Sequence, residues 1–257
     1  MHSLLLTAIN VALGAVLGAA GGLLGIGGGL IAIPLLGYLY GMDQHLAQGT
    51  ALVMIVPNVL MSLLRYHQNH RIDLRSAGAI VVFATASSYV AARLAAGIGA
   101  GALHTAFAVF LVVLGLYFGW PRRRSPAHDD ARPAPARRIP RAALPLLGIA
   151  SGGMSGIFTV GGSLVVVPAL VSLFGMPQTR AQGMALTVVV PGGLVALVAY
   201  AQAGHVSWTI GLPMALGGVL SVSRGVALAH TLPARHLRTL FCLVLLGTAA
   251  GMLFAPH

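Results

Sequence analysis

A glycine-interrupted apolar segment occurs twice in this chain. Residues 14–68 align with residues 148–202 after a shift of 134 positions, without a gap and with 23 of 55 positions identical. Glycine and proline weaken a helix, so their recurrence at the same places in both copies indicates that the chain needs them there. Two copies of an interrupted apolar unit are typical of membrane transporters. The matched positions include Gly27-Gly28 with Gly161-Gly162, Pro34 with Pro168, Ala47-Gln48-Gly49 with Ala181-Gln182-Gly183, and Pro57 with Pro191.

The composition indicates which solvent the chain folds in. Hydrophobic residues make up 57% of the chain and charged residues 7%, and the mean hydropathy is +0.89. Soluble domains carry about 25% charged residues, so this chain has too few polar side chains to cover a water-facing surface. We therefore expect an all-α, polytopic helical membrane protein whose exterior is solvated by hydrocarbon.

Apolar runs bounded by polar or helix-breaking residues predict the same series of helices in both halves, 1–120 and 142–257. Each half is expected to open with a helix that ends in a glycine-rich break, followed by a short apolar piece and three ordinary spans. The Pro- and Arg-rich stretch 121–141 is expected to be a solvated cytoplasmic linker. The predicted helices cover 4–24, 28–41, 46–64, 76–96 and 102–120 in the first half, and 142–158, 162–175, 180–199, 207–230 and 236–254 in the second.

The two short pieces, 28–41 and 162–175, decide the symmetry. At about 1.5 Å per residue, about 14 residues reach only about 21 Å, less than a hydrocarbon core of about 30 Å. If neither piece crosses, each half has four spans and the halves run parallel. If both cross, each half has five spans and the halves are inverted. The arginines favour the inverted arrangement with both termini outside, because it places 13 of the 15 arginines on the cytoplasmic side.

The charged residues and Cys242 narrow the classes of partner. Although the net charge is +11, seven of the 15 arginines lie in the linker, which indicates a cytoplasmic loop and no nucleic-acid binding. Cys242 lies in an apolar run, so neither a disulfide nor a thiolate metal site is expected. No histidine pairs with a Cys, Glu or second His at ligand spacing within a predicted span, and no carboxylate lies inside one, so we expect no catalysis, no metal and no cofactor. The expected partners are the lipid bilayer and a small anionic substrate, with a homo-oligomer left open.

The glycine-rich breaks, residues 21–29 and 155–163, are the strongest candidate site. A helix that starts at such a break points its unpaired N–H groups and the positive end of its dipole toward the break, which favours an anion. The alternative is that the glycines only allow close helix packing, the role that we assign to Gly14, Gly18, Gly148 and Gly152. The candidate substrate-binding positions are Gly27, Gly28, Gly29, Gly161, Gly162 and Ser163.

Five polar side chains complete the candidate site: Gln48, Gln182, Thr50, Asn58 and Arg224. The two glutamines lie at matching starts of spans, where amide donors suit an oxyanion, the alternative being an interfacial residue or a helix cap. Thr50 and Asn58 have no polar counterpart in the second copy, so such a site is asymmetric. Arg224 lies about six residues inside a span, where it either binds the anion or snorkels to the interface.

The doubled motifs resemble those of a known family. With its paired glycine-rich breaks, each followed by a proline, and its paired Ala-Gln-Gly-x-Ala-Leu segments at 47–52 and 181–186, the chain resembles the TauE/SafE sulfite exporter family. The stretch 91–95, Ala-Ala-Arg-Leu-Ala, is similar to that family's Gly-Ala-Arg-Leu-type segment, with Ala91 in place of the usual glycine. The resemblance covers nearly the whole chain apart from the linker. It implies a bacterial inner-membrane permease for sulfite, sulfonates or related organic anions.

The leading hypothesis is a secondary transporter for a small anion. The substrate would bind between the two glycine breaks, assisted by Gln48, Gln182 and Arg224, and access would alternate as the halves rock. A passive anion channel and a non-catalytic membrane assembly factor are the alternatives. Without carboxylates in the spans, uniport down the membrane potential is the simplest coupling, and it slightly favours export. Which anion moves, and in which direction, stays open.

Overall fold

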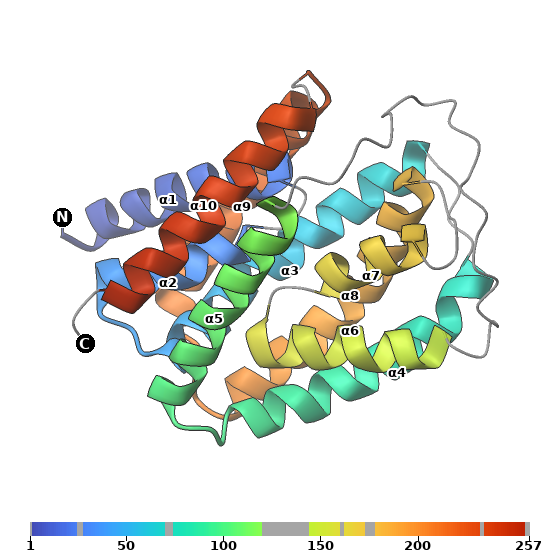
Figure 1. Cartoon of the computed structure of the whole chain (residues 1–257). Helices are drawn as coiled ribbons and strands as arrows, with labels where there is room; N and C mark the ends of the chain where they lie inside the picture. Colours follow the sequence, from blue (N-terminus) through green and yellow to red (C-terminus); the bar gives the residue numbers. More distant parts are fainter. Residues whose placement is uncertain are drawn as a thin grey trace.

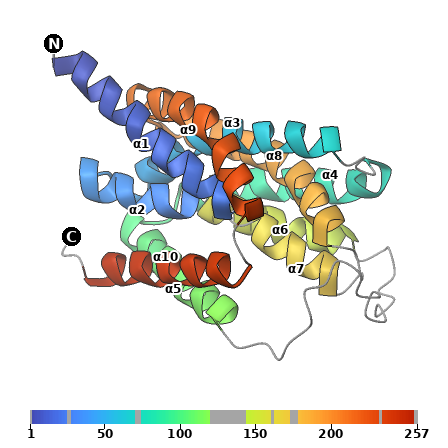
Figure 2. The same ribbon diagram turned by 90° about the horizontal axis from the view of Figure 1, so that it is seen from above.

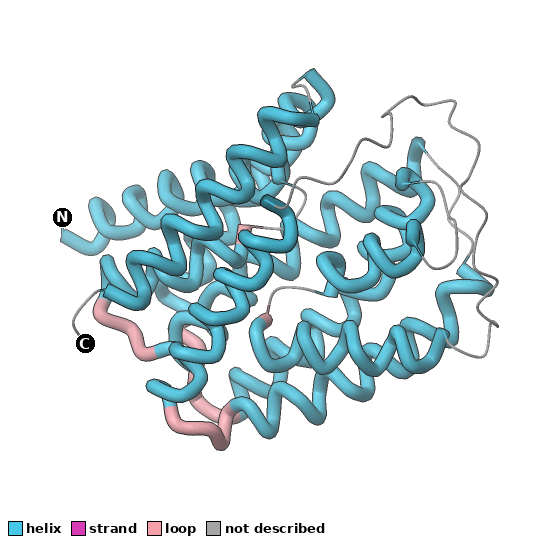
Figure 3. Tube along the Cα trace, in the orientation of Figure 1, coloured by secondary structure: helices cyan, strands magenta, loops and turns pink. Residues whose placement is uncertain are grey.

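The computed structural model describes residues 2–24, 28–69, 74–119, 144–159, 162–172, 178–231 and 234–254. Within these ranges the chain forms helices and short loops and no strand (Figure 3), which confirms the predicted all-α class. The helices are α1 (His2–Leu24), α2 (Gly29–Tyr40), α3 (Gln44–Asn69), α4 (Leu74–Ala95), α5 (Ala100–Gly119), α6 (Leu144–Phe158), α7 (Gly162–Ser172), α8 (Gln178–Gln202), α9 (Trp208–Thr231) and α10 (Ala234–Phe254).

The helices follow the predicted order, and most of their ends lie close to the predicted ones. The largest difference is α3, which was expected to end at Leu64 and continues to Asn69. The apolar run does end at Leu64, but the polar residues 65–69 contain neither glycine nor proline, so nothing in them stops the helix. Helices α3 and α8 also continue across Pro57 and Pro191.

Length and composition make the chain a multi-pass membrane protein. Among the described residues, five helices are long and apolar enough to cross a bilayer, and these are α1, α3, α5, α8 and α9. Helices α2 and α7 have only 12 and 11 residues, so at about 1.5 Å per residue each is shorter than a hydrocarbon core. Large apolar side chains face outward, among them Leu4 at 75% and Leu220 at 73% exposure. Such a surface is favourable in lipid and unfavourable in water.

The helices form an elongated bundle in which α1 begins and α10 ends at the same end (Figures 1 and 2). Helix α1 packs along α9, and α6 packs along α4. Helices α3 and α8 contact each other and join these two pairs, because α3 also packs on α9 and α8 on α4. Helices α5 and α10 pack together on one side of the bundle (Figure 2).

Glycines set the distance between the paired helices. A Cβ atom at Gly14 would lie 2.0 Å from the Met214 carbonyl oxygen on α9, and one at Gly148 would lie 2.7 Å from the Ile80 carbonyl oxygen on α4. No side chain fits at either position, which confirms the packing role predicted for these glycines. Gly14 and Gly148 are 134 positions apart, and so are Ile80 and Met214. The contacts therefore follow the same shift as the sequence repeat.

The same correspondence continues along both helix pairs. Between α1 and α9, Gly18 faces Gly218 and Gly22 faces Val222. At the matching places between α6 and α4, Gly152 faces Ala84 and Gly156 faces Ser88. Residue numbers rise together in each pair, so α1 runs parallel to α9 and α6 runs parallel to α4. Helix α9 begins beside the start of α3, and α4 returns in the opposite direction to α3 (Figure 1). Helix α6 therefore runs opposite to α1.

Candidate functional site

The first glycine break joins α1 to α2 inside the bundle. Gly28 is buried and adopts a left-handed conformation with φ of 84°. A Cβ atom there would lie 2.6 Å from the Leu17 carbonyl oxygen, so both the backbone angle and the space require glycine. Gly29, also buried, begins α2. Gly27 lies outside the described residues.

The second break joins α6 to α7. Thr159 is buried and has a positive φ of 56°, which a threonine rarely adopts. It occupies the place that Gly25 has in the first copy. Across the break, the carbonyl oxygen of Gly162 accepts a hydrogen bond of 3.1 Å from the Ser151 hydroxyl. Ser163 is half-buried at the start of α7, and Gly161 lies outside the described residues.

Gln48 lies at the centre of the candidate site. Its side chain is fully buried, and its Oε1 accepts a hydrogen bond of 2.7 Å from the Tyr200 hydroxyl on α8. That hydroxyl also lies 3.5 Å from the carbonyl oxygen of Ile157, at the end of α6. The contact therefore brings Gln48, from the first copy, to the glycine break of the second. It also orients the amide, because Oε1 faces Tyr200 and Nε2 must point elsewhere.

The Gln48 amide nitrogen has no hydrogen-bond partner among the described residues. A buried amide donor left without a partner is unfavourable by about 1–3 kcal/mol. A ligand oxygen at this place would satisfy it.

Asn58 and Thr50 have different surroundings on the same helix. Asn58 is fully buried, and neither atom of its amide has a partner among the described residues. It lies against α9, where a Cβ atom at Gly218 would come within 2.6 Å of its Nδ2. Thr50 is also buried, but its hydroxyl accepts a hydrogen bond of 3.0 Å from the backbone N–H of Ser207. Thr50 thus holds the loop between α8 and α9.

Of the remaining two predicted residues, the structure describes the side chain of Arg224 alone, and it does not join this buried group. Arg224 lies on the exposed surface of α9, within a candidate span, so its guanidinium is not among the buried polar side chains. This position fits the snorkelling alternative for Arg224. The backbone of Gln182 belongs to α8, and its side chain lies outside the described part of the chain.

Two residues of this region were missed by sequence reasoning. Tyr200 contacts Gln48, and the signal for it was available, because the repeat shift pairs Tyr200 with Tyr66. Ser88 donates a buried hydrogen bond of 2.9 Å to the carbonyl oxygen of Gly192, which follows Pro191 in α8. The position that matches Ser88 in the other copy is the apolar Val222, so the sequence carried no comparable signal for Ser88.

The buried polar side chains include no acidic group among the described residues. Among the described residues, the buried polar side chains are amides, hydroxyls and one imidazole, with no carboxylate. Amides and hydroxyls both donate and accept hydrogen bonds, so they can bind a polar group without a charged side chain. No group of three or more His, Cys, Asp or Glu side chains gathers as a metal site within the described ranges.

Comparison with known proteins identifies the family. The family model "Sulfite exporter TauE/SafE" matches residues 10–252. The chain is 29% identical to a "Probable membrane transporter protein" of Xylella fastidiosa, over 94% of this chain and 92% of that one. It is 26% identical to a protein of the same description from Methanocaldococcus jannaschii, over 94% and 93% of the two chains. No solved structure matches. The chain therefore belongs to the TauE/SafE sulfite exporter family of membrane transporters.

Proposed function

We propose that this transporter moves small oxyanions, such as sulfite, sulfonates or related organic anions, through the buried polar group around Gln48. The observation that carries the proposal is the unpartnered amide nitrogen of Gln48, held in orientation by Tyr200. An oxygen of the substrate would complete it. Asn58 is a second amide without a partner among the described residues, about 15 Å further along the same helix, where the substrate would meet it after leaving Gln48.

The glycine breaks support the choice of an anion. Helices α2 and α7 both begin inside the bundle, at the buried residues Gly29 and Gly162. The first N–H groups of a helix have no intrahelical partner and carry the positive end of its dipole. Two such ends, together with neutral amide donors, would attract an anion without a buried cation, which would be unfavourable in the apolar bundle.

We also propose that the halves 1–120 and 142–257 are inverted repeats that rock against each other, with 121–141 as the linker. Support comes from the opposite directions of α1 and α6 and from the shift of 134 positions shared by the glycine contacts. In transporters built from inverted repeats, exchange of the two conformations between repeats exposes one site to each side in turn. Gln48 and Tyr200 belong to different halves, so rocking would change their contact.

The test is transport by the purified protein in proteoliposomes. Labelled sulfite and a panel of sulfonates should show saturable flux and counterflow. Gln48→Leu should reduce that flux at least about tenfold, since it removes a hydrogen bond to a charged group. Gln202→Leu, the same change at an exposed position of α8, should leave flux unchanged. Flux that is linear in concentration without counterflow would indicate the channel alternative, and no flux with any anion would refute the proposal.

A further inference from the structure

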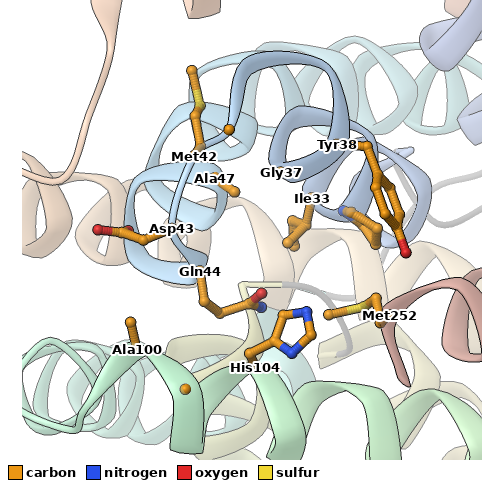
Figure 4. Close-up of a pocket in the computed structure, with 13 residues that line it drawn as sticks. Ile33, Gly37, Tyr38, Met42, Asp43, Gln44, Ala47, Ala100, His104 and Met252 are labelled. Atoms are coloured by element: carbon orange, nitrogen blue, oxygen red, sulfur yellow. The ribbon is translucent and has the colours of Figure 1, made fainter. Parts of the chain in front are cut away.

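A cavity of about 610 Å³ opens at the end of the bundle where α1 begins and α10 ends. It lies between the end of α2, the loop that follows it, and the first turns of α3 and α5, with the last turn of α10 on one side (Figure 4). Its volume is within the range of small-molecule sites. Part of its wall is apolar, formed by Ile33, Pro34, Ala47 and Met252.

One of the residues that line this cavity, Gln44, is a buried polar side chain. Gln44 is only 5% exposed, and its amide nitrogen has no hydrogen-bond partner among the described residues. Its side chain reaches toward His104, which lies across the cavity on α5 (Figure 4). The buried donor and the apolar wall together call for a ligand that has an acceptor group at one end and an apolar body.

Gln44 and Gln48 are one helical turn apart on α3, so both lie on the same face of the helix. Ala47, between them in sequence, also lines the cavity. The two unpartnered amides therefore form a short series that leads from the cavity to the buried polar group.

We infer that this cavity is a vestibule that binds small organic anions, with Gln44 donating to the anionic head and the apolar wall receiving the carbon chain. The inference rests on the proposed function and narrows its substrate class, because inorganic sulfite has no apolar part to fill the wall. An organic sulfonate with a short alkyl chain matches both features. From Gln44 the head group would pass to Gln48.

Asp43 makes the sign of the ligand's charge testable. It lines the cavity, and its Oδ1 accepts a hydrogen bond of 2.8 Å from the backbone N–H of Leu46, which caps α3. Asparagine caps a helix about as well as aspartate. Asp43→Asn therefore removes a negative charge beside the ligand while keeping the cap, and it should tighten binding of an anion by about threefold.

Two glycines provide a substitution that fills the cavity and a matched control away from it. Gly101 lines the cavity and has open space around its missing Cβ atom, so Gly101→Leu should fold and occupy part of the volume. Gly247, on α10, is exposed and also has open space. Gly247→Leu is therefore the same change away from the cavity.

The experiment measures binding of methane-, ethane-, propane- and butanesulfonate to the purified protein by thermal shift. Affinity should rise with chain length, by up to about fourfold for each methylene buried. Gly101→Leu should remove that dependence, and Gly247→Leu should keep it. Gln44→Leu should weaken binding of the whole series about tenfold, while Gln202→Leu should not.

Three results would overturn the inference. They are affinity independent of chain length, a chain-length dependence that survives in Gly101→Leu, and weaker binding in Asp43→Asn, which would indicate a cationic ligand. Sulfite flux that needs Gln48 but shows none of these cavity effects would leave the proposed function standing and refute the vestibule. Sulfonate binding with all the cavity effects but no flux would leave the vestibule standing and refute the proposed function.

Discussion

The hydroxyl of Tyr200 donates a hydrogen bond of 2.7 Å to the side-chain oxygen of Gln48, across 152 positions of the chain. Both side chains are fully buried. The bond joins α3 of the first half to α8 of the second. It leaves the amide nitrogen of Gln48 as the donor that faces away from Tyr200. The orientation of this donor depends on a residue from the other half of the molecule.

Tyr200→Phe should therefore impair transport through Gln48. The phenyl ring keeps the packing, but the Gln48 amide loses the bond that orients it. We expect KM for the transported anion to rise about fivefold, the effect of one neutral hydrogen bond, with the maximal rate little changed. Proteoliposome flux measures both parameters. The double variant with Gln48→Leu should be no worse than Gln48→Leu alone, and additive losses would show that the two residues act independently.

Gly28→Ala should destabilise the protein more than Gly41→Ala. Both glycines have positive φ, 84° and 62°, which is unfavourable by about 1 kcal/mol or more for an alanine. A Cβ atom at Gly41 would meet nothing within 4 Å, whereas one at Gly28 would lie 2.6 Å from a backbone oxygen. Thermal unfolding in detergent should show a small drop in Tm for Gly41→Ala and a larger one for Gly28→Ala. Equal drops would contradict the tight packing of the first break.

Replacing Gly152 by a larger residue should disrupt the close contact between α6 and α4. A Cβ atom at Gly152 would lie 2.1 Å from the Ala84 carbonyl oxygen, whereas one at the neighbouring Gly153 meets nothing within 4 Å. Gly152→Leu should lower the yield of monodisperse protein in size-exclusion chromatography, and Gly153→Leu should not. Gly18→Leu, at the corresponding place on α1, should behave like Gly152→Leu. A stable, well-folded Gly152→Leu would show that the helices are not in close contact.

The inverted arrangement predicts which loops face the outside. In a Cys242→Ser background, Ala203→Cys in the loop between α8 and α9 should react with a membrane-impermeant maleimide in intact cells. Ser125→Cys in the basic linker should react only after permeabilisation. Ala203 is exposed, so the label has access. Labelling of both positions only after permeabilisation would support four parallel spans in each half, which place the loop between α8 and α9 inside.

Much of the architecture was predictable because it depends on local chemistry. Apolar runs and helix breakers predicted the order of the helices, including the short α2 and α7. The repeat predicted which glycines matter, and Gly14 and Gly148 indeed pack against carbonyl oxygens of neighbouring helices. The end of α3 was missed because hydropathy reports where the apolar run ends, while a helix continues through polar residues that do not break it.

The sequence by itself determined that this chain is a helical membrane protein with two copies of a glycine-broken unit. Both properties depend on local residue types and not on which helices pack together. Only the tertiary structure decided that Gln48 contacts Tyr200, that the Thr50 hydroxyl accepts a hydrogen bond from the Ser207 backbone, and that Arg224 lies on an exposed surface. These outcomes depend on how each helix is rotated about its axis and on which helices pack together. In an almost uniformly apolar chain, hydrophobic periodicity does not encode that rotation, so close packing at glycines and a few buried hydrogen bonds determine it.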